Sequence, residues 1–287
     1  MNGPSLLLTL LERSAADTTL AEPTRWRERI ALLDQLEHFL LDPTVTDAAL
    51  LERARALQSR LEHANARLFE TIRADIRRGD PDALRRWLPP VTDADFSAGH
   101  PEAYDDRDAI VAGVLQVEEP GPTSVERSAD MVFYQPTPAR QVLDLLDRLP
   151  MSSDDVFVDI GSGLGHVPML VSICTSVRSV GLEIEPAYVA AARRAADALE
   201  LRVVTFIEAD AREASLDEGT AFFMYTPFTG GMLRTVLDRL HEQARRREIR
   251  VCAFGPFVPT VAAESWLAPT EPVRDGRVAI FRSRVTR

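Results

Sequence analysis

The sequence predicts an α/β fold in which an open, mostly parallel sheet carries helices on both faces and follows an N-terminal helical bundle. Three observations predict it. Apolar repeats of helical spacing fill the first ninety residues, strand-length apolar runs alternate with amphipathic stretches after residue 131, and a glycine-rich turn follows the first run. Strands separated by helices are typical of parallel sheets. We expect domains over residues 1–90 and 131–287, with 91–130 as a linker or an excursion over the active site.

The first ninety residues predict a small bundle of helices. Apolar side chains recur at helical spacing between Arg25 and Leu41, and a longer helix is expected from about Thr46, as N-cap, to Gly79, as C-cap. Asp80-Pro81 is expected to open a short third helix, because proline is tolerated at the first helical position. Such stripes are ordinary core spacing. We interpret the bundle as a lid, a scaffold or a dimer contact, and a homodimer through these helices is one expectation.

The segment 89–131 is rich in Pro, Gly, Asp and Glu around one apolar run over 109–117. Its acids and single histidine suggest a metal site at first sight. Their spacing is irregular, whereas metal sites show fixed ligand geometry, so we predict a solvated acidic loop and no metal. The residues concerned are Asp93, Asp95, His100, Asp105, Asp106 and Asp108.

Composition limits location and partners. The 287-residue chain has a formal net charge of -11, and its 33 basic residues are all arginine. A field of that sign repels phosphate, so nucleic acid and anionic lipid are not expected partners. No apolar stretch approaches the roughly 20 residues that cross a bilayer, and Cys174 and Cys252 fall in segments that predict helix and strand, which favours a reducing compartment. We expect a cytoplasmic protein with a small-molecule or protein substrate.

Six apolar runs after residue 131 predict the strands of the sheet. They cover residues 156–160, 180–184, 203–207, 221–225, 249–254 and 278–281.

The most specific motif is the stretch 156–166. Its strand delivers Asp159 and then a turn with Gly161, Gly163 and Gly165 that opens a helix. Such a turn lets a ligand approach bare backbone at the carboxyl edge of a sheet. A dinucleotide fingerprint spaces its glycines G-x-G-x-x-G. Here the third position is His166, which counts against NAD or FAD.

Two further acids follow the next two strands. Glu183 lies about twenty residues after the turn, where an acid can accept hydrogen bonds from both ribose hydroxyls, and we prefer it to Glu185. Asp210 follows the third run and is expected to accept from an adenine amino group, while the Ala211 backbone donates to a ring nitrogen. Turn and acids in register predict a site for an adenosyl ligand.

From residue 131 onward these features resemble the class I S-adenosylmethionine-dependent methyltransferases, a seven-stranded α/β fold. In motif the chain is most similar to the histone-lysine methyltransferase family named for disruption of telomeric silencing. Residues 153–167 are similar to that family's first motif, 255–259 to its segment after the fifth strand, and 133–138 to its element before the first strand. The resemblance implies S-adenosylmethionine as cofactor, with Tyr134 and Thr137 at its methionine carboxylate. The full expected cofactor set is Tyr134, Thr137, Asp159, Gly161, Ser162, Gly163, Gly165, Glu183, Asp210, Ala211, Tyr225 and Thr226.

The end of the fourth predicted strand departs from that family. An Asn-Asn-Phe-like sequence walls the lysine channel there, whereas this chain has Met-Tyr-Thr-Pro-Phe-Thr over residues 224–229. That run is also faintly similar to the Asn-Pro-Pro-Phe element of amino-methylating nucleic-acid enzymes but lacks its leading Asn or Asp. Neither substrate class carries over. We expect the acceptor at Tyr225, Pro227 and Phe228, with Tyr225 as the catalytic residue and core packing as the alternative role of Phe228.

The predicted function is methyl transfer to a nitrogen or oxygen nucleophile on a small molecule or a protein side chain. Transfer from a sulfonium is an in-line displacement, so the protein chiefly aligns donor and nucleophile in a dry site. Two alternatives stay open. One is a non-catalytic protein that binds the cofactor or a partner on the same fold. The other is a nucleotide-dependent oxidoreductase on a related sheet.

Overall fold

The computed structural model describes residues 3–96, 102–118, 120–125 and 129–284. Contacts divide the chain into two compact units. One contains the residues up to 75 together with 109–114, and the other contains 76–108 together with the chain from 115 onward. The division falls inside a long helix, so the predicted boundary at residue 90 stays a prediction.

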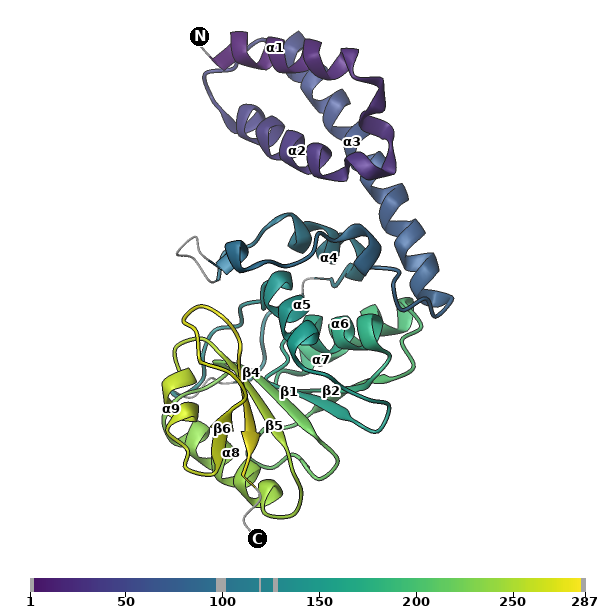
Figure 1. Ribbon diagram of the computed structural model, residues 1–287. Coiled ribbons are helices and arrows are strands. Elements are labelled where there is room, and N and C mark those ends of the chain that lie inside the picture. Colours follow the sequence, from purple (N-terminus) through teal and green to yellow (C-terminus); the bar gives the residue numbers. More distant parts are fainter. Residues whose placement is uncertain (1–2, 97–101, 119, 126–128, 285–287) are drawn as a thin grey trace. The chain divides into compact units, whose positions relative to one another are not determined.

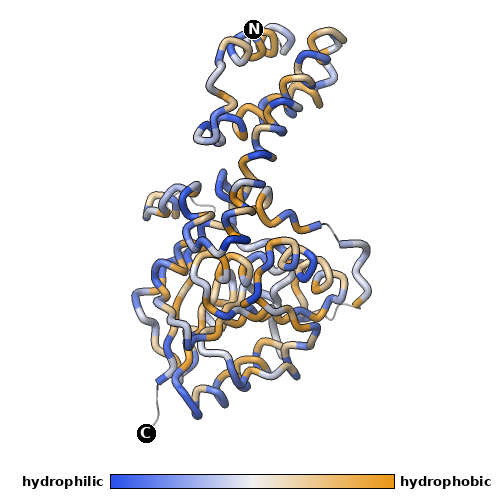
Figure 2. Tube along the Cα trace, turned by 90° about the vertical axis from the view of Figure 1, so that its right-hand side faces the viewer, coloured by the Kyte–Doolittle hydropathy of each residue, from blue (hydrophilic) through white to orange (hydrophobic). Residues whose placement is uncertain are grey.

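The first unit is built mainly from three helices, α1 (Gly3–Ala16), α2 (Trp26–Leu41) and α3 (Ala48–Arg77), of which α3 extends two residues beyond it. Its residues 109–114 belong to a fourth helix, α4 (Asp106–Leu115). The short 3-10 turns η1 (Thr18–Ala21) and η2 (Pro23–Arg25) join α1 to α2. Leucines from all three helices form its core, and the tube in Figure 2 alternates between apolar and polar colours along them, as amphipathic helices do. Across the described part of the chain, none of the helices is long and apolar enough to span a bilayer.

Two predictions at the helix ends were wrong. Asp47, not Thr46, caps α3, because its carboxylate accepts from the Leu50 N–H at 3.1 Å. The third helix expected at Asp80-Pro81 is a turn followed by the 3-10 helix η3 (Arg85–Trp87). The Asp80 side chain accepts from the Asp82 N–H at 3.0 Å, which favours a turn over an α-helix.

The second unit contains a seven-stranded sheet in the order β3-β2-β1-β4-β5-β7-β6 (Figure 1). The strands β1 to β5 pair in parallel, and β7 runs antiparallel to both of its neighbours. The predicted α/β fold class is therefore confirmed. The strands are β1 (Val156–Ile160), β2 (Arg178–Glu183), β3 (Val204–Glu208), β4 (Ala221–Tyr225), β5 (Arg250–Phe254), β6 (Leu267–Pro269) and β7 (Ala279–Ser283).

Helices cover both faces of this sheet. In Figure 1, α5, α6 and α7 lie on one face and α8 and α9 on the other. Strand side chains such as Phe222 and Met224 pack with Leu233 and Val236 of α8 in one core cluster. Each buried apolar side chain of this kind contributes about 1.5 to 3 kcal/mol. The helices are α5 (Ala139–Arg148), α6 (His166–Thr175), α7 (Pro186–Ala198), α8 (Gly230–Ala244) and α9 (Val258–Ala262).

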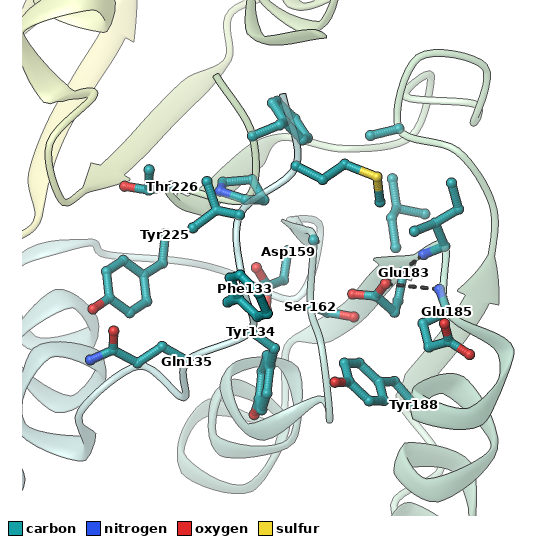
Figure 3. Close-up of a pocket in the computed structure, with 18 of the residues that line it drawn as sticks. Phe133, Tyr134, Gln135, Asp159, Ser162, Glu183, Glu185, Tyr188, Tyr225 and Thr226 are labelled. Carbon is teal, nitrogen blue, oxygen red and sulfur yellow. Dashed lines mark hydrogen bonds between the residues drawn. The ribbon is translucent and has the colours of Figure 1, made fainter. Parts of the chain in front are cut away.

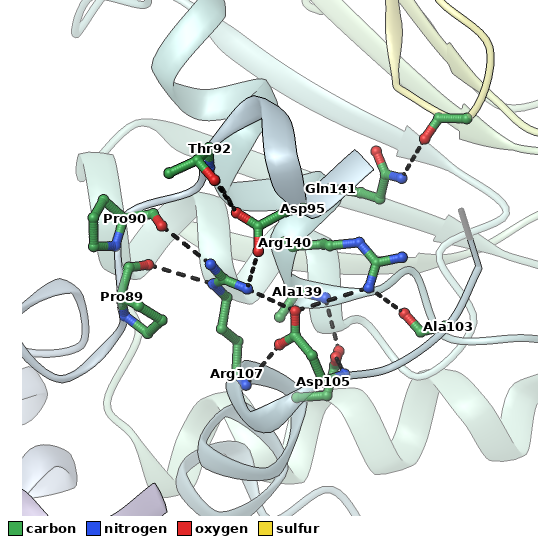
Figure 4. A network of polar contacts seen from close by, with 12 residues as sticks. Pro89, Pro90, Thr92, Asp95, Ala103, Asp105, Arg107, Ala139, Arg140 and Gln141 are labelled. Atoms are coloured by element: carbon green, nitrogen blue, oxygen red, sulfur yellow. Dashed lines mark hydrogen bonds and ion pairs between the residues drawn. The ribbon is translucent and has the colours of Figure 1, made fainter. Parts of the chain in front are cut away.

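The acidic segment before the sheet is fixed by buried arginines (Figure 4). It contains the 3-10 helix η4 (Asp93–Phe96) and the start of α4 (Asp106–Leu115). Arg107, 6% exposed, bonds the carbonyls of Pro89 and Pro90 and the carboxylates of Asp95 and Asp105.

The same segment is tied to α5. Buried Arg140 donates to the Ala103 carbonyl at 2.6 Å, and the Asp108 carboxylate accepts from the Ala139 N–H at 2.7 Å. Asp93 pairs with Arg277 at 3.0 Å. Asp95 and Asp105 thus pair with buried Arg107, which corrects the predicted solvated loop at these two positions, whereas Asp93 pairs with Arg277 but keeps a 74% exposed side chain. His100 lies outside the described residues.

Candidate active site

A cavity opens at the carboxyl edge of the sheet, beside the point between β1 and β4 where the strand order reverses. Open parallel sheets bind ligands at such switch points, because the loops from neighbouring strands diverge there. Together with the open space at its mouth, the cavity encloses about 1080 Å³. Twelve of the fourteen predicted site residues line it, all except Gly163 and Gly165.

The glycine turn forms the floor of this region. The N–H groups of Gly161 and Ser162 both donate to the Leu182 carbonyl of β2, each at 2.9 Å, which locks the turn to the neighbouring strand. Gly163 has a φ of +51°, and a Cβ there would stand 2.0 Å from the Tyr134 ring. Gly165 starts α6 at a φ of +78°. The turn therefore requires glycine for conformation and for close approach.

Glu183 ends β2 and faces the turn. Its carboxylate accepts from the N–H of Gly163 at 2.8 Å, of Ile184 at 2.8 Å and of Glu185 at 2.9 Å. Burial is the first cause that raises the pKa of Glu183, and these backbone hydrogen bonds act against it. A carboxylate offers about four acceptor positions. The three backbone donors leave room for roughly one more hydrogen bond without rearrangement.

Asp159 at the end of β1 is 3% exposed and lies next to Glu183 in the cavity wall. Burial, and then the charge of Glu183, raise the pKa of Asp159 well above its usual 3.8. Two desolvated carboxyls that share one cavity favour a ligand that donates hydrogen bonds or carries positive charge. An adenosyl sulfonium has both features.

Asp210 and Ala211 follow β3 and line the same cavity. The Asp210 carboxylate forms an ion pair with Arg212 at 2.6 Å and accepts from the Arg212 backbone N–H at 2.8 Å. The side-chain bond from Arg212 is the main cause that lowers the pKa of Asp210. Asp210 thus stands at the predicted position as an ionised acceptor that already has one cationic partner.

The segment before α5 supplies an aromatic wall. The Tyr134 hydroxyl lies 3.1 Å from the His166 Nδ1, and its ring lies 5.4 Å from the ring of Tyr188. Burial lowers the pKa of His166 to about 4, so this imidazole is neutral at physiological pH. Thr137 lines the cavity from the same segment. A tyrosine hydroxyl and a neutral histidine suit a polar but uncharged contact.

The end of β4 forms the opposite side of the cavity, and Figure 3 places Tyr225 beside Gln135 and apart from Glu183 and Glu185. Thr226 has a positive φ of 37°, and its hydroxyl donates to the Phe254 carbonyl at 3.1 Å. Non-glycine residues rarely adopt this conformation, which costs about 1 to 3 kcal/mol and is concentrated at functional sites. Thr226 itself lines the cavity.

Phe228 is buried and Pro227 half-buried after the end of β4. Phe228 is 3% exposed and belongs to the core cluster shared with α8. Pro227 Cβ would meet a Cβ on Gly161 at 2.3 Å, so the proline packs directly on the glycine turn. Both residues line the cavity, and both also support its shape.

Two buried hydroxyls in the cavity wall, Ser162 Oγ and Tyr225 Oη, form no hydrogen bond of normal geometry within the described residues, although the Glu102 carboxylate acts on Tyr225. An unpaired buried hydroxyl costs about 1 to 3 kcal/mol, so native proteins rarely retain one without a use. Ser162 belongs to the glycine turn and Tyr225 to the β4 end. A ligand that spans the cavity and offers polar atoms at both places would satisfy them, and S-adenosylmethionine is long and polar enough to fit this requirement.

Several lining residues were not predicted. Thr123 and Val125 come from the excursion, Met131, Val132 and Phe133 from the segment before α5, and Tyr188 from α7. Phe133 and Gln135 lie within residues 133–138, which resemble the family's element before the first strand, and that resemblance was the only feature of the sequence that pointed to them. The others reach the cavity through contacts distant in sequence.

A sequence model of the family described as "Histone methylation protein DOT1" matches residues 127–214. No curated protein matches the chain. Among solved structures, the chain is similar to an RNA methyltransferase from Salinibacter ruber in complex with S-adenosyl-L-homocysteine, at 26% identity over 52% of this chain and 92% of that one, with a TM-score of 0.42. It is also similar to a precorrin-6y C5,15-methyltransferase from Geobacter metallireducens, at 23% identity over 56% and 94% of the two chains, with a TM-score of 0.40. The family match confirms the resemblance predicted from the glycine turn and the acids that follow it.

Proposed function

We propose, since this chain carries a class I S-adenosylmethionine-dependent methyltransferase domain, that it transfers a methyl group to a nitrogen or oxygen nucleophile of a small molecule or a protein side chain. Bound S-adenosylmethionine supplies an activated methyl on a sulfonium, a good leaving group. The protein's own residues have to hold the donor, seat the nucleophile and exclude water.

The buried Tyr225 hydroxyl carries this proposal. It lines the cavity at the end of β4, forms no hydrogen bond of normal geometry within the described residues, and lies close enough to the Glu102 carboxylate to feel its charge. Burial, and then the nearby Glu102 carboxylate, raise the pKa of Tyr225, so it stays a neutral hydroxyl that can both donate and accept. A nucleophile with N–H or O–H can donate to Tyr225 and direct its lone pair at the methyl carbon. The Tyr225 and Phe254 rings, 4.7 Å apart, exclude water around it.

The charge of the cavity supports a neutral or cationic acceptor. Among the described residues that line it, none is arginine, whereas Asp159, Glu183, Glu185 and Asp210 are acids. A polyanion would therefore meet repulsion where it must approach. This favours a small molecule or a protein side chain over nucleic acid.

The test has two steps. Calorimetry on the full chain measures binding of S-adenosylhomocysteine, with NAD as the matched control, and we expect only the first to bind. Transfer from radiolabelled S-adenosylmethionine is then measured on a fractionated metabolite extract, a protein extract and total RNA. Label in either of the first two fractions supports the proposal, and label in RNA alone overturns the acceptor class.

Tyr225→Phe separates catalysis from binding. We expect the variant to bind S-adenosylhomocysteine within about twofold of the wild type and to transfer methyl about 2- to 10-fold more slowly, the worth of one hydrogen bond. Tight binding by the wild type without transfer to any fraction would instead support the non-catalytic alternative.

A further inference from the structure

Glu185 is more deeply buried than its position after a strand suggests. It lies two residues beyond Glu183, is 5% exposed, and caps the N-terminus of α7 through a 3.5 Å bond from the Ala187 N–H. A single cap bond of this length occupies only part of one carboxylate oxygen. The remaining acceptor capacity is used elsewhere.

The main partners of Glu185 lie sixty residues upstream. The Ser124 N–H lies 3.1 Å from Oε1 and 3.0 Å from Oε2, the Ser124 hydroxyl donates to Oε1 at 3.0 Å, and the Val125 N–H donates to Oε2 at 3.0 Å. Burial acts to raise the pKa of Glu185, but the bonds from Val125 and Ser124 outweigh it and leave that pKa below its usual value. One ionised carboxylate therefore fixes two consecutive residues of the excursion.

The residues held in this way are part of the cavity. Thr123 and Val125 line it together with Glu183, Ser162 and Asp210. The segment 120–125 otherwise consists of exposed or half-buried residues, with glycine and two prolines at its start. Its position at the cavity thus depends on few contacts, and the bonds to Glu185 are the strongest of those described.

We propose that Glu185 is a positioning residue that fixes the segment 120–125 as one wall of the cofactor cavity. Glu185 already accepts from four donors, the Ser124 N–H and hydroxyl and the N–H groups of Val125 and Ala187, which fill the roughly four acceptor positions of a carboxylate. It therefore acts through this segment and not by accepting from the ribose. Glu183, which retains acceptor capacity, keeps that role. The inference rests on the proposed function only in that the ligand of the cavity is S-adenosylmethionine or its product.

Two variants weaken the attachment in different ways. Glu185→Gln keeps the shape of the side chain but removes the charge and turns an NH2 group toward the Ser124 and Val125 donors. Ser124→Ala removes one donor and leaves the α7 cap intact, so it reports on the attachment even if Glu185→Gln destabilises the helix. We expect each to weaken binding of S-adenosylhomocysteine by about 2- to 10-fold, and we expect Ser124→Ala to have no further effect in the Glu185→Gln background, because both act on one bond set.

The decisive measurement compares S-adenosylhomocysteine with its 2′-deoxyribose analogue by calorimetry. If Glu185 positions a wall, Glu185→Gln keeps the wild-type preference for the 2′-hydroxyl although both ligands bind more weakly, whereas Glu183→Ala loses that preference. Hydrogen exchange of the Ser124 and Val125 amides should also become faster in Glu185→Gln without ligand.

The outcomes separate the two proposals. Unchanged affinity in Glu185→Gln, or loss of the 2′-hydroxyl preference in that variant, overturns the positioning role and leaves the proposed function intact. Binding of S-adenosylhomocysteine by the wild type without any methyl transfer removes the proposed function, while the expected changes in affinity and amide exchange would still support the role of Glu185.

Discussion

The Glu183 carboxylate accepts a 2.8 Å hydrogen bond from the backbone N–H of Gly163, so the acid after β2 is bonded directly to the glycine turn after β1. The two features that the sequence places twenty residues apart therefore form one unit. A ligand that bonds to Glu183 is held by a carboxylate whose position the turn already fixes, which reduces the ordering cost of binding.

Replacing Glu183 by alanine should weaken cofactor binding. The variant loses the acceptor for the ribose and leaves the Gly163 N–H without its partner, and we expect a loss of about 1 to 3 kcal/mol, or roughly 5- to 150-fold in affinity. Calorimetry with S-adenosylhomocysteine measures it. Glu208→Ala is the matched control, because Glu208 pairs with Glu183 in the sheet register but is exposed and outside the cavity wall. Equal affinity in Glu183→Ala would remove Glu183 from the site.

Gly163→Ala should abolish tight cofactor binding and lower stability. The added Cβ would stand 2.0 Å from the Tyr134 ring at a φ of +51°, so the ring must move out of the wall. The conformation alone costs about 1 to 2 kcal/mol for a residue with a side chain. Gly231→Ala is the control, because its Cβ would meet nothing closer than 3.6 Å. A folded Gly163→Ala variant with wild-type affinity would contradict the role of the turn.

The pH dependence of stability should reveal Asp159. Burial and then Glu183 raise the pKa of Asp159 above 3.8, so the folded protein holds this proton at pH values where the unfolded chain has lost it. The stability that the carboxyl contributes is thus complete below about pH 3.8 and is lost as the pH rises through the folded pKa.

Asp159→Asn cannot titrate and should flatten this decline. We expect the free energy of unfolding of the ligand-free variant to fall less steeply than that of the wild type as the pH rises from 4 to 8, in urea titrations. Exposed Asp154→Asn serves as the control and should follow the wild type. Parallel curves for wild type and Asp159→Asn would show that the buried carboxyl titrates normally.

Arg107→Met should destabilise the second unit strongly. It removes the donors to the Pro89 and Pro90 carbonyls, leaves Asp95 without its cation and leaves Asp105 with only Arg140 at 3.8 Å, which typically costs about 3 to 5 kcal/mol. Arg86→Met is the matched control: its side chain is 51% exposed and pairs with Asp80, so we expect about 0 to 1 kcal/mol. Chemical denaturation measures the free energy of unfolding of both variants. Similar losses in the two would contradict a structural role for the Arg107 cluster.

Sequence reasoning succeeded where the signal is local. The bounds of β1 and β4 agree with the apolar runs 156–160 and 221–225, because nearly all residues of both strands are buried and a run without alternation marks their full length. The three-residue strand β6 was missed, since it is too short for any periodicity and ends in a proline. Asp47 was passed over for Thr46, although both are common N-caps.

Residues of the site could likewise be predicted only where a local sequence pattern marks them. The turn and Glu183 follow their strands in sequence, so the parallel topology brings them together. Thr123 and Val125 lie in the cavity wall because their segment bonds to Glu185, some sixty residues away. No sequence pattern in the segment 120–125 predicts that contact. The pairing of the acidic segment with Arg107 and Arg140 was likewise invisible, because the charges alone predict solvation.

The insertion of β7 between β5 and β6 has a consequence for synthesis on the ribosome. A nascent chain that has emerged only to about residue 270 holds β5 with an open edge and β6 with no neighbour, because both pair only with residues 279–283 on that side. Unpaired strand edges recruit other chains. Translation pauses before β7 has emerged should therefore favour aggregation, and pauses after β7 has emerged should not.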